Sequence, residues 1–202
     1  MPRPLAPLGL LIFFALGASA ADPPTVKVPR VDRAPKLEDF LEMKPNAAWE
    51  GRLLKIDGFL QREPTDGKPI SQKTEAYVGY DDRNFYAIFV CFDADPGKIR
   101  ARLGRREDIF EDDLVGVFFD TFHDRTHSYA LYSTPLGVQG DSLQTEGQRD
   151  DFSFDTLWYS QGKVTAQGYV VWMSIPFKSL RFHSGGLPNL GLWPASGDHP
   201  EQ

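Results

Sequence analysis

The stretch that decides the fold is Glu111 to Asp141, EDDLVGVFFDTFHDRTHSYALYSTPLGVQGD. Three acidic residues precede an apolar run, Leu114–Phe119. The polar segment DTFHDRTH follows from Asp120 and leads into a second, alternating run, Ser128–Ser133. Short apolar or alternating runs bounded by turn-forming side chains are typical of β-strands. The stretch therefore predicts a β-hairpin.

Acidic residues lie at both ends of the first predicted strand. Aspartate is common in turns, because its side chain hydrogen-bonds to nearby backbone N–H groups. Carboxylates gathered at one end of a β-sandwich would also supply the oxygen ligands that Ca²⁺ prefers. The sequence leaves both interpretations open, and the candidate calcium ligands are Asp112, Asp113, Asp120 and Asp124.

Further strands are predicted on both sides of this hairpin. Lys73–Tyr80 alternates in polarity, and Phe85–Phe92 is nearly all apolar. The turn-forming segment Asp81–Asn84 joins them, so the pair predicts a hairpin whose second strand is central and covered on both faces. The remaining candidates are Ile56–Leu60, a hairpin of Phe154–Ser160 and Val164–Gln167 around Gln161–Gly162, and the strand Gly168–Ile175, with Gln144–Ser153 as a polar loop.

The composition agrees with a β protein. Aromatic residues make up 13% of the 202 residues, with 18 Gly and 16 Pro, which favours short strands and tight turns over long helices. Short strands at fairly even spacing predict an all-β sandwich. The net charge of −6 argues against a nucleic-acid partner, because phosphates require a basic face.

The N-terminal residues have the features of a secretory signal. Arg3 gives a positive start, Leu8–Leu16 is an apolar run too short to span a bilayer, and Ala18–Ala20 is a cleavage site of small residues. We therefore expect an exported protein that lies in the periplasm, at the outer membrane or outside the cell. The expected organisation is a signal peptide at 1–20, a linker at 21–36, a β-sandwich at 37–183 and an irregular tail at 184–202, which a truncation or frameshift would explain.

Sequence motifs for catalysis are absent. The chain contains no GxSxG, Walker or dinucleotide-binding pattern, and its four histidines lack zinc-site spacing. Cys91 lies in an apolar run, so we expect a buried thiol that acts as a small hydrophobic residue. We therefore expect a non-catalytic protein. A haem-binding sandwich with Met173 or His127 as axial ligand stays open as an alternative.

Aromatic residues beside polar segments suggest a ligand for this sandwich. Carbohydrate binding uses flat rings against the apolar faces of sugars and planar polar groups for their hydroxyls. Trp49 and Trp158 lie beside polar segments and are the leading candidates, with Tyr80, Tyr129 and Tyr159 as further ones. Trp172 lies within an apolar strand, so we expect it in the core.

Several short phrases follow one another in a fixed order between Lys36 and Phe182. They are Ala48-Trp49, Lys73-Thr74-Glu75, Tyr80-Asp81-Asp82, Phe92-Asp93-Ala94-Asp95-Pro96, Arg105-Arg106-Glu107-Asp108, Asp112-Asp113-Leu114-Val115-Gly116-Val117, Phe119-Asp120-Thr121-Phe122, Pro135 to Asp141 and Ile175 to Phe182. Together they resemble the family 9 carbohydrate-binding-module-like domain. The similarity is closest to the version at the N-terminus of exported bacterial proteins that continue into a predicted outer-membrane β-barrel.

This resemblance implies a jelly-roll-type antiparallel β-sandwich that binds sugar. In sugar-binding members two aromatic rings clamp a terminal sugar, while carboxylates, amides and arginines bond its hydroxyls, a role that falls here to Arg106. Some members carry structural calcium. The chain departs from the family at Trp172-Met173-Ser174, where a carboxylate is usual, and after Phe182, where barrel sequence would follow.

The leading hypothesis is an exported, non-catalytic carbohydrate-binding domain that serves polysaccharide catabolism. The principal alternative is a structural periplasmic domain of an outer-membrane β-barrel protein, without a sugar ligand. A glycoside hydrolase component and the haem-binding sandwich are the lesser alternatives.

The signal-peptide interpretation predicts cleavage after Ala20. Mass spectrometry of the exported protein should find a mature N-terminus at Ala21. An intact Met1 on the exported protein would contradict this prediction and indicate a retained N-terminal anchor.

Overall fold

The computed structural model describes residues 27–61, 66–106, 108–122, 124, 126–181 and, for the backbone alone, 189–193. The predicted signal peptide and residues 21–26 of the predicted linker lie outside the described residues, as do His123, His183 and His199. Within the described part of the chain, no helix is both long and apolar enough to cross a membrane.

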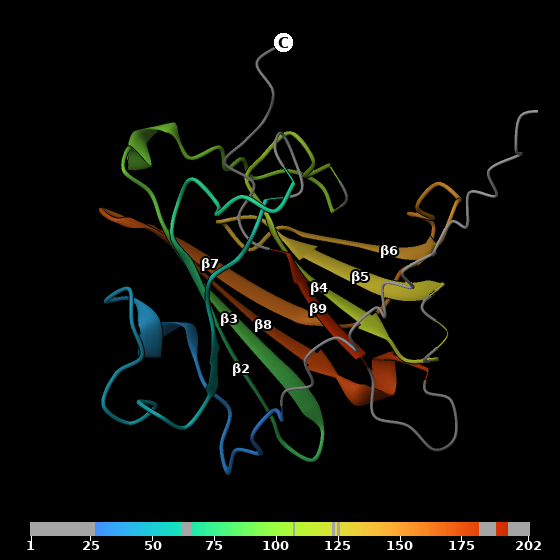
Figure 1. The fold of residues 1–202 in the computed structure, drawn as a ribbon, viewed down its shortest axis with the longest axis horizontal. Helices are drawn as coiled ribbons and strands as arrows, with labels where there is room; N and C mark the ends of the chain where they lie inside the picture. The colour runs from blue at the N-terminus through green and yellow to red at the C-terminus, as the bar shows by residue number, and fades with distance from the viewer. Residues whose placement is uncertain are drawn as a thin grey trace, which may run out of the picture.

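Two antiparallel sheets face each other (Figure 1). The five-stranded sheet has the order β1 (Leu54–Ile56), β2 (Thr74–Tyr80), β3 (Asn84–Phe92), β8 (Gly168–Pro176) and β7 (Tyr159–Thr165). The four-stranded sheet has the order β6 (Gln139–Thr145), β5 (His127–Ser133), β4 (Val115–Asp120) and β9 (Asn189–Trp193). Short 3₁₀ helices occur at η1 (Leu37–Phe40), η2 (Pro96–Lys98) and η3 (Phe177–Ser179). The predicted all-β, jelly-roll-type antiparallel β-sandwich is confirmed.

The main core fills the space between the sheets. Successive side chains of a strand point to opposite faces, so alternate residues of β3 and β8 meet those of β4 and β5. Phe85 and Phe119 cross this interface with ring centroids 5.3 Å apart and an interplanar angle of 89°, the edge-to-face geometry that aromatic pairs favour. Burial of each such side chain stabilises the fold by roughly 1.5–3 kcal/mol.

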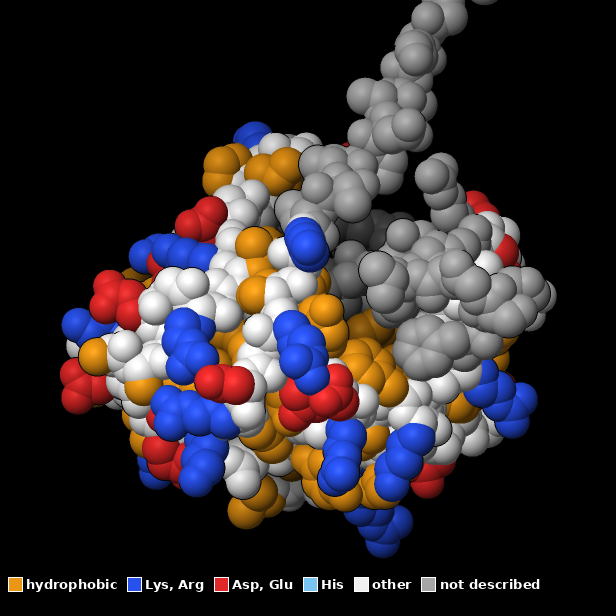
Figure 2. Space-filling view, turned by 90° about the horizontal axis from the view of Figure 1, so that it is seen from below, with side chains coloured by type: hydrophobic (Ala, Val, Ile, Leu, Met, Phe, Trp, Pro, Cys, Tyr) orange, Lys and Arg blue, Asp and Glu red, His pale blue; other side chains and the backbone are white. Residues whose placement is uncertain are grey.

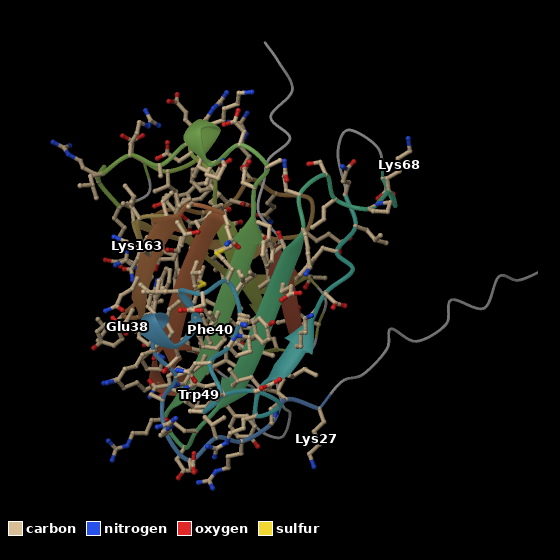
Figure 3. The ribbon with its side chains drawn as sticks, turned by 90° about the vertical axis from the view of Figure 1, so that its left-hand side faces the viewer. Lys27, Glu38, Phe40, Trp49, Lys68 and Lys163 are labelled. Carbon is tan, nitrogen blue, oxygen red and sulfur yellow. The ribbon has the colours of Figure 1, made fainter. Side chains whose placement is uncertain are left out.

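The outer face of the five-stranded sheet is also buried. The N-terminal segment, residues 31–53, lies against it and brings Phe40 and Trp49 onto Ile88 and Val90 of β3 (Figure 3). Asp39 fixes this segment, because its carboxylate accepts hydrogen bonds from the Trp49 indole at 2.8 Å and from the Lys36 backbone N–H at 2.9 Å. Strand β3 is therefore central and covered on both faces, as its apolar sequence predicts.

The structure corrects the predicted hairpin around Gln161–Gly162. These two residues lie within the single strand β7, and the chain reverses instead just before Gly168, which has a φ of 139°. Gly162 has a packing role. An added Cβ there would meet the Pro135 carbonyl group and the Gly137 backbone nitrogen, both in the turn that joins β5 to β6. A glycine is therefore needed at position 162 because the two sheets approach each other closely there, and not because the chain turns.

The predicted irregular tail also requires correction. Residues 189–193 form β9, which pairs antiparallel with β4 from Asp120↔Asn189 to Gly116↔Trp193. The pairing gives the backbone groups of β4 hydrogen-bond partners on its second side. The sequence concealed this strand, because five residues with a central glycine carry too little periodicity to stand out. The rest of the predicted tail, 184–188 and 194–202, lies outside the described residues.

The contact at Gly162 predicts that Gly162→Ala destabilises the fold by about 1–3 kcal/mol, because the new methyl group overlaps backbone atoms that cannot rotate away. Urea unfolding measures the change. Gly97→Ala is the control, since its added Cβ would meet only the flexible Asp95 carboxylate at 3.5 Å. Equal stabilities for the two variants would show that the turn yields without cost.

Candidate functional site

The two tryptophans predicted to contact sugar are both buried and lie apart. Trp49 is 1% exposed on the outer side of the five-stranded sheet, with the guanidinium groups of Arg33 and Arg52 at 5.0 and 5.7 Å from its ring. Trp158 is 2% exposed in the core between the sheets. The five-stranded sheet separates these clusters, so the two rings do not form one clamp. Trp172, expected in the core, is partly buried, and its indole donates to the Pro35 carbonyl at 2.8 Å.

Of the predicted tyrosines, Tyr129 shares the core between the sheets with Trp158, and Tyr80 packs against the same core. Tyr80 is partly buried at the end of β2, where its ring lies 6.4 Å from that of Phe177. Tyr129 is 5% exposed and points from β5 into the core between the sheets. Trp49, Trp158 and Tyr129 are therefore buried side chains that present no exposed ring face to a ligand.

Arg106 binds a carboxylate of its own chain. Its Nε and Nη2 atoms lie 2.9 and 2.7 Å from Oδ1 of Asp141, whose side chain is fully buried. The Thr156 backbone N–H donates to Oδ2 of the same carboxylate at 2.8 Å. Arg106 also reaches Asp155 at 3.1 Å. A buried carboxylate needs such partners, so this arginine has a structural role beside Asp141, and its predicted bonding to sugar stays a prediction.

The four predicted calcium ligands do not gather into one site. Asp112 binds the side chain and backbone of Arg102, and Asp113 accepts a hydrogen bond from the Arg100 backbone. These two carboxylates precede β4, whereas Asp120 ends it and Asp124 follows. A six-residue strand spans roughly 17 Å, too far for shared coordination. Within the described ranges, no group of three or more His, Cys, Asp or Glu side chains has the geometry of a metal site.

Asp124 is instead a turn residue. Its carboxylate accepts hydrogen bonds from the backbone N–H groups of Thr126 and His127, each at 2.9 Å, and contacts His127 Nδ1 at 2.7 Å. These bonds hold the pKa of Asp124 well below its ordinary value. The turn interpretation therefore describes this residue, and calcium binding by this chain stays a prediction without an assigned site.

The structure brings together a different set of aromatic residues on the outer face of the four-stranded sheet. Residues paired across antiparallel strands share a face, so Phe118 stands beside Ala130 and Tyr132 stands between Gly116 and Gly140. The two glycines leave the Tyr132 ring without a side-chain neighbour in its own row of the sheet. Two loops supply the remaining rings. We call Phe110, Phe118, Tyr132 and Phe152 the aromatic face.

The rings of the aromatic face form a corner rather than a flat platform. Phe110 contacts Tyr132 and Phe152 with centroid distances of 5.6 and 5.0 Å and interplanar angles of 77° and 64°. Phe118 meets Tyr132 at 5.6 Å and 86°. Phe110 is 43% exposed and Phe152 is 37% exposed. Phe110 and Phe152 are thus exposed to solvent, and they lie beside the more buried rings of Phe118 and Tyr132.

A hydrogen-bonded amide and carboxylate adjoin the aromatic face. Nε2 of Gln144 donates to the Tyr132 hydroxyl at 3.1 Å and to Oδ2 of Asp150 at 2.9 Å. Burial and the negative charge of Asp150 raise the pKa of Tyr132, so the phenol stays neutral. Asp150 is partly exposed and forms no ion pair within the described part of the chain. Apolar rings and unshared carboxylate lone pairs therefore meet at one place.

This site is hidden in the sequence, because the composition of Gln144–Ser153 predicts a polar loop. Strand β6 includes Gln144, but its sequence QGDSLQT contains a single large apolar residue, so strand periodicity is weak. The available signal was the isolated aromatic residues among charges, Phe110 in DIFEDD and Phe152 in RDDFSF. Only the pairing of β5 with β6 and the loop paths place them together.

A second polar cluster lies on the outer side of the five-stranded sheet. Oε1 of the buried Glu75 is 2.8 Å from Nζ of both Lys55 and Lys73, and the Tyr77 hydroxyl donates to Oε2 at 2.6 Å. Burial alone would raise the pKa of Glu75, but these hydrogen bonds outweigh it and lower the pKa to about 2. The carboxylate is surrounded by its own chain's donors, so we assign the cluster a structural role.

The surface charges are mixed. On the side of the molecule that Figure 2 shows, Lys and Arg side chains stand among Asp and Glu side chains and do not gather by sign. Two of the surface ion pairs are Arg30–Asp82 at 2.6 Å and Arg52–Asp32 at 2.9 Å. Such exposed pairs contribute little stability, about 0–1 kcal/mol each.

Comparison with known proteins identifies the fold. No family model and no curated protein matches the sequence. A crystal structure from Bacteroides uniformis ATCC 8492, described as a "putative carbohydrate-binding protein", is 14% identical, with a TM-score of 0.53 over 86% of this chain and 90% of that one. The two chains share their fold.

Two structures of a family 9 carbohydrate-binding module from Caldicellulosiruptor kristjanssonii also resemble this chain. The complex with glucose is 13% identical, with a TM-score of 0.48 over 81% of this chain and 73% of that one. The complex with cellotriose is 13% identical, with a TM-score of 0.44 over 72% of this chain and 66% of that one.

The Glu75 cluster predicts an acid-sensitive contribution to stability. Because the folded-state pKa of Glu75 is about 2, below its ordinary value of 4.5, the contribution is complete above about pH 4.5 and is lost as the pH falls towards 2. Glu75→Gln should therefore lower the free energy of unfolding at pH 7, by roughly 1–3 kcal/mol, and make its dependence on pH below 4.5 shallower. Denaturant unfolding from pH 7 to 2.5 measures both effects.

Glu42→Gln is the control for this measurement, because Glu42 is exposed. That variant should keep the parent's dependence on pH. If the free energy of unfolding of Glu75→Gln depended on pH as steeply as that of the parent, the ionised Glu75 carboxylate would not stabilise the fold.

Proposed function

We propose that this chain is a non-catalytic carbohydrate-binding domain and that the aromatic face is its binding surface. The observation that carries the proposal is the contact between two exposed phenylalanine rings, Phe110 and Phe152, beside the hydrogen-bonded pair Gln144 and Asp150. A sugar ring has apolar C–H faces and a polar edge of hydroxyl groups. Rings and carboxylate oxygens at one corner complement both parts of such a ligand.

The geometry suggests how a sugar would sit. One sugar face would cover Phe110 or Phe152, with its hydroxyl edge towards Asp150, whose Oδ1 atom accepts no hydrogen bond from the described side chains and backbone groups. The Gln144 amide is already oriented by Ser128 and Tyr132, at 3.4 and 3.1 Å, so binding requires little ordering of the polar groups. A shallow site of this size suits dissociation constants in the micromolar to millimolar range.

The cellular role in this proposal is the recognition of polysaccharide outside the cytoplasm. The N-terminal stretch supports export, and the resemblance of the ordered phrases supports a link to polysaccharide catabolism and to an outer-membrane partner. The fold shared with the Bacteroides uniformis protein supports the same class of ligand. No step of catalysis is assigned to the aromatic face.

A second candidate function is a structural domain without a sugar ligand. Two observations favour it: Trp49 and Trp158 are buried, and Arg106 pairs with Asp141. Residues expected to bind sugar therefore make contacts that stabilise the fold. A glycan array, followed by calorimetry with and without calcium, separates the two functions. Binding of a glycan supports the first, and absence of binding in both conditions supports the second.

The proposal predicts that Phe110→Ala and Phe152→Ala each weaken glycan binding about fivefold or more, because each removes a ring from the exposed corner. Both rings are partly exposed, so thermal unfolding should change little. Tyr159→Ala is the matched control, since Tyr159 is 51% exposed but lies on β7 of the other sheet. Equal loss of affinity in the control, or none in the phenylalanine variants, would contradict the assignment.

A further inference from the structure

The carboxylate of Asp150 is linked to Tyr132 of the aromatic face through the amide of Gln144. Arg106 is taken up by Asp141 and Asp155, and Arg102 is taken up by Glu111 and Asp112. Asp150 receives only the neutral Gln144 amide, and its chain neighbour Arg149 is not within ion-pair distance. The corner of rings therefore adjoins a negative charge that no described cation neutralises.

We infer that the aromatic face selects sugars by charge, favouring an amino sugar over a neutral one and rejecting a uronic acid. The inference rests on the proposed function and names the ligand class of the same site. A protonated amino group on the sugar would face the Asp150 carboxylate, which its Gln144 bond holds beside Tyr132. A uronate at that place would meet a like charge instead.

The aromatic rings act in the same direction as the carboxylate. The face of a benzene ring carries negative electrostatic potential and attracts a cation placed above it. Phe110 and Phe152 meet at an interplanar angle of 64°, so a ligand over one ring lies beside the other. An ammonium group over the exposed face of either ring is attracted by that face and by the carboxylate. A carboxylate group at the same position is repelled by both.

The arrangement also explains the chemistry of Tyr132. Its pKa is raised by burial and by Asp150, so its hydroxyl remains a neutral hydrogen-bond group and adds no second negative charge. The hydroxyl oxygen already accepts a hydrogen bond from the Gln144 amide. Discrimination by charge in this site therefore depends on Asp150, and a single substitution addresses it.

The test compares three soluble oligosaccharides by calorimetry with the full chain. A β-1,4-glucosamine pentamer and cellopentaose differ by an ammonium in place of a hydroxyl group, and a galacturonic acid pentamer carries carboxylates. At about pH 5.5 the amino groups of the glucosamine pentamer are protonated. We expect the glucosamine pentamer to bind about three- to tenfold more tightly than cellopentaose, and the galacturonic acid pentamer to bind more weakly than either.

Asp150→Asn and Asp151→Asn are the matched variants, because they make the same charge change at adjacent positions. Asp151 bonds to Ser153 and is exposed. Asp150→Asn should bring the ratio of the affinity for the glucosamine pentamer to the affinity for cellopentaose close to one. Asp151→Asn should leave this ratio unchanged. In the parent protein 0.5 M salt should reduce the ratio, a measurement that needs no variant.

The outcomes separate the two proposals. Binding of cellopentaose with no preference for the glucosamine pentamer would overturn the inference and leave the proposed function standing. If Asp150→Asn and Asp151→Asn reduced the preference for the glucosamine pentamer equally, the inference would also be overturned. The preference would then depend on the net charge of the protein and not on the position of Asp150. No binding of any of the three, together with a negative glycan array, would overturn the proposed function itself.

Discussion

Burial of β3 on both faces is the constraint on which the rest of the molecule depends. Phe85 and Phe89 point towards the four-stranded sheet, and Ile88 and Val90 point the opposite way. One covering layer would leave half of these side chains in water, so the chain must supply two. The four-stranded sheet is one layer, and the N-terminal segment with Phe40 and Trp49 is the other. The outer face of the four-stranded sheet is the one that carries the aromatic face.

The same constraint determines where charges are used. Loops and edges that close the sandwich bury carboxylates, and each buried carboxylate is matched with donors, as Asp141 is with Arg106 and Glu75 is with Lys55 and Lys73. Removing one partner would leave an uncompensated charge, which costs more than the pair contributes. Closure of the fold therefore accounts for the buried carboxylates of the described residues, Glu75, Asp112 and Asp141. Asp150 differs because its partner is the neutral amide of Gln144.

Much of the fold could be predicted from the sequence. The alternation of Lys73–Tyr80 and the apolar run Phe85–Phe92 identify two adjoining strands, because their periodicity follows directly from burial on one face or both. Strand β6 and the backbone strand 189–193 escaped prediction, since their pairing partners supply what their own composition lacks. Gly162 was read as a turn residue, because a sequence does not show which backbone approaches a glycine.

The site was less predictable than the fold, for a physical reason. Whether a tryptophan contacts solvent depends on what covers it, and Trp49 is covered by its own segment and two arginines. Phe110 and Phe152 lie 42 positions apart and meet only because β4, β5 and β6 pair in order and bring the two loops together. Local sequence can mark an isolated aromatic residue among charges. It cannot say that two such residues share a corner.

The chemistry of the aromatic face suits the proposed sugar ligand better than it suits a protein partner. A scattered exposed phenylalanine needs no explanation, because folded surfaces contain much apolar area. Here two exposed rings adjoin Asp150 and Gln144, whose polar atoms would lose water under any tightly packed cover. An apolar protein surface would leave that carboxylate buried without a new partner, at a cost of several kcal/mol. The proposed sugar ligand would cover the rings with its C–H face and return hydrogen bonds from its hydroxyls to the polar groups of Gln144 and Asp150.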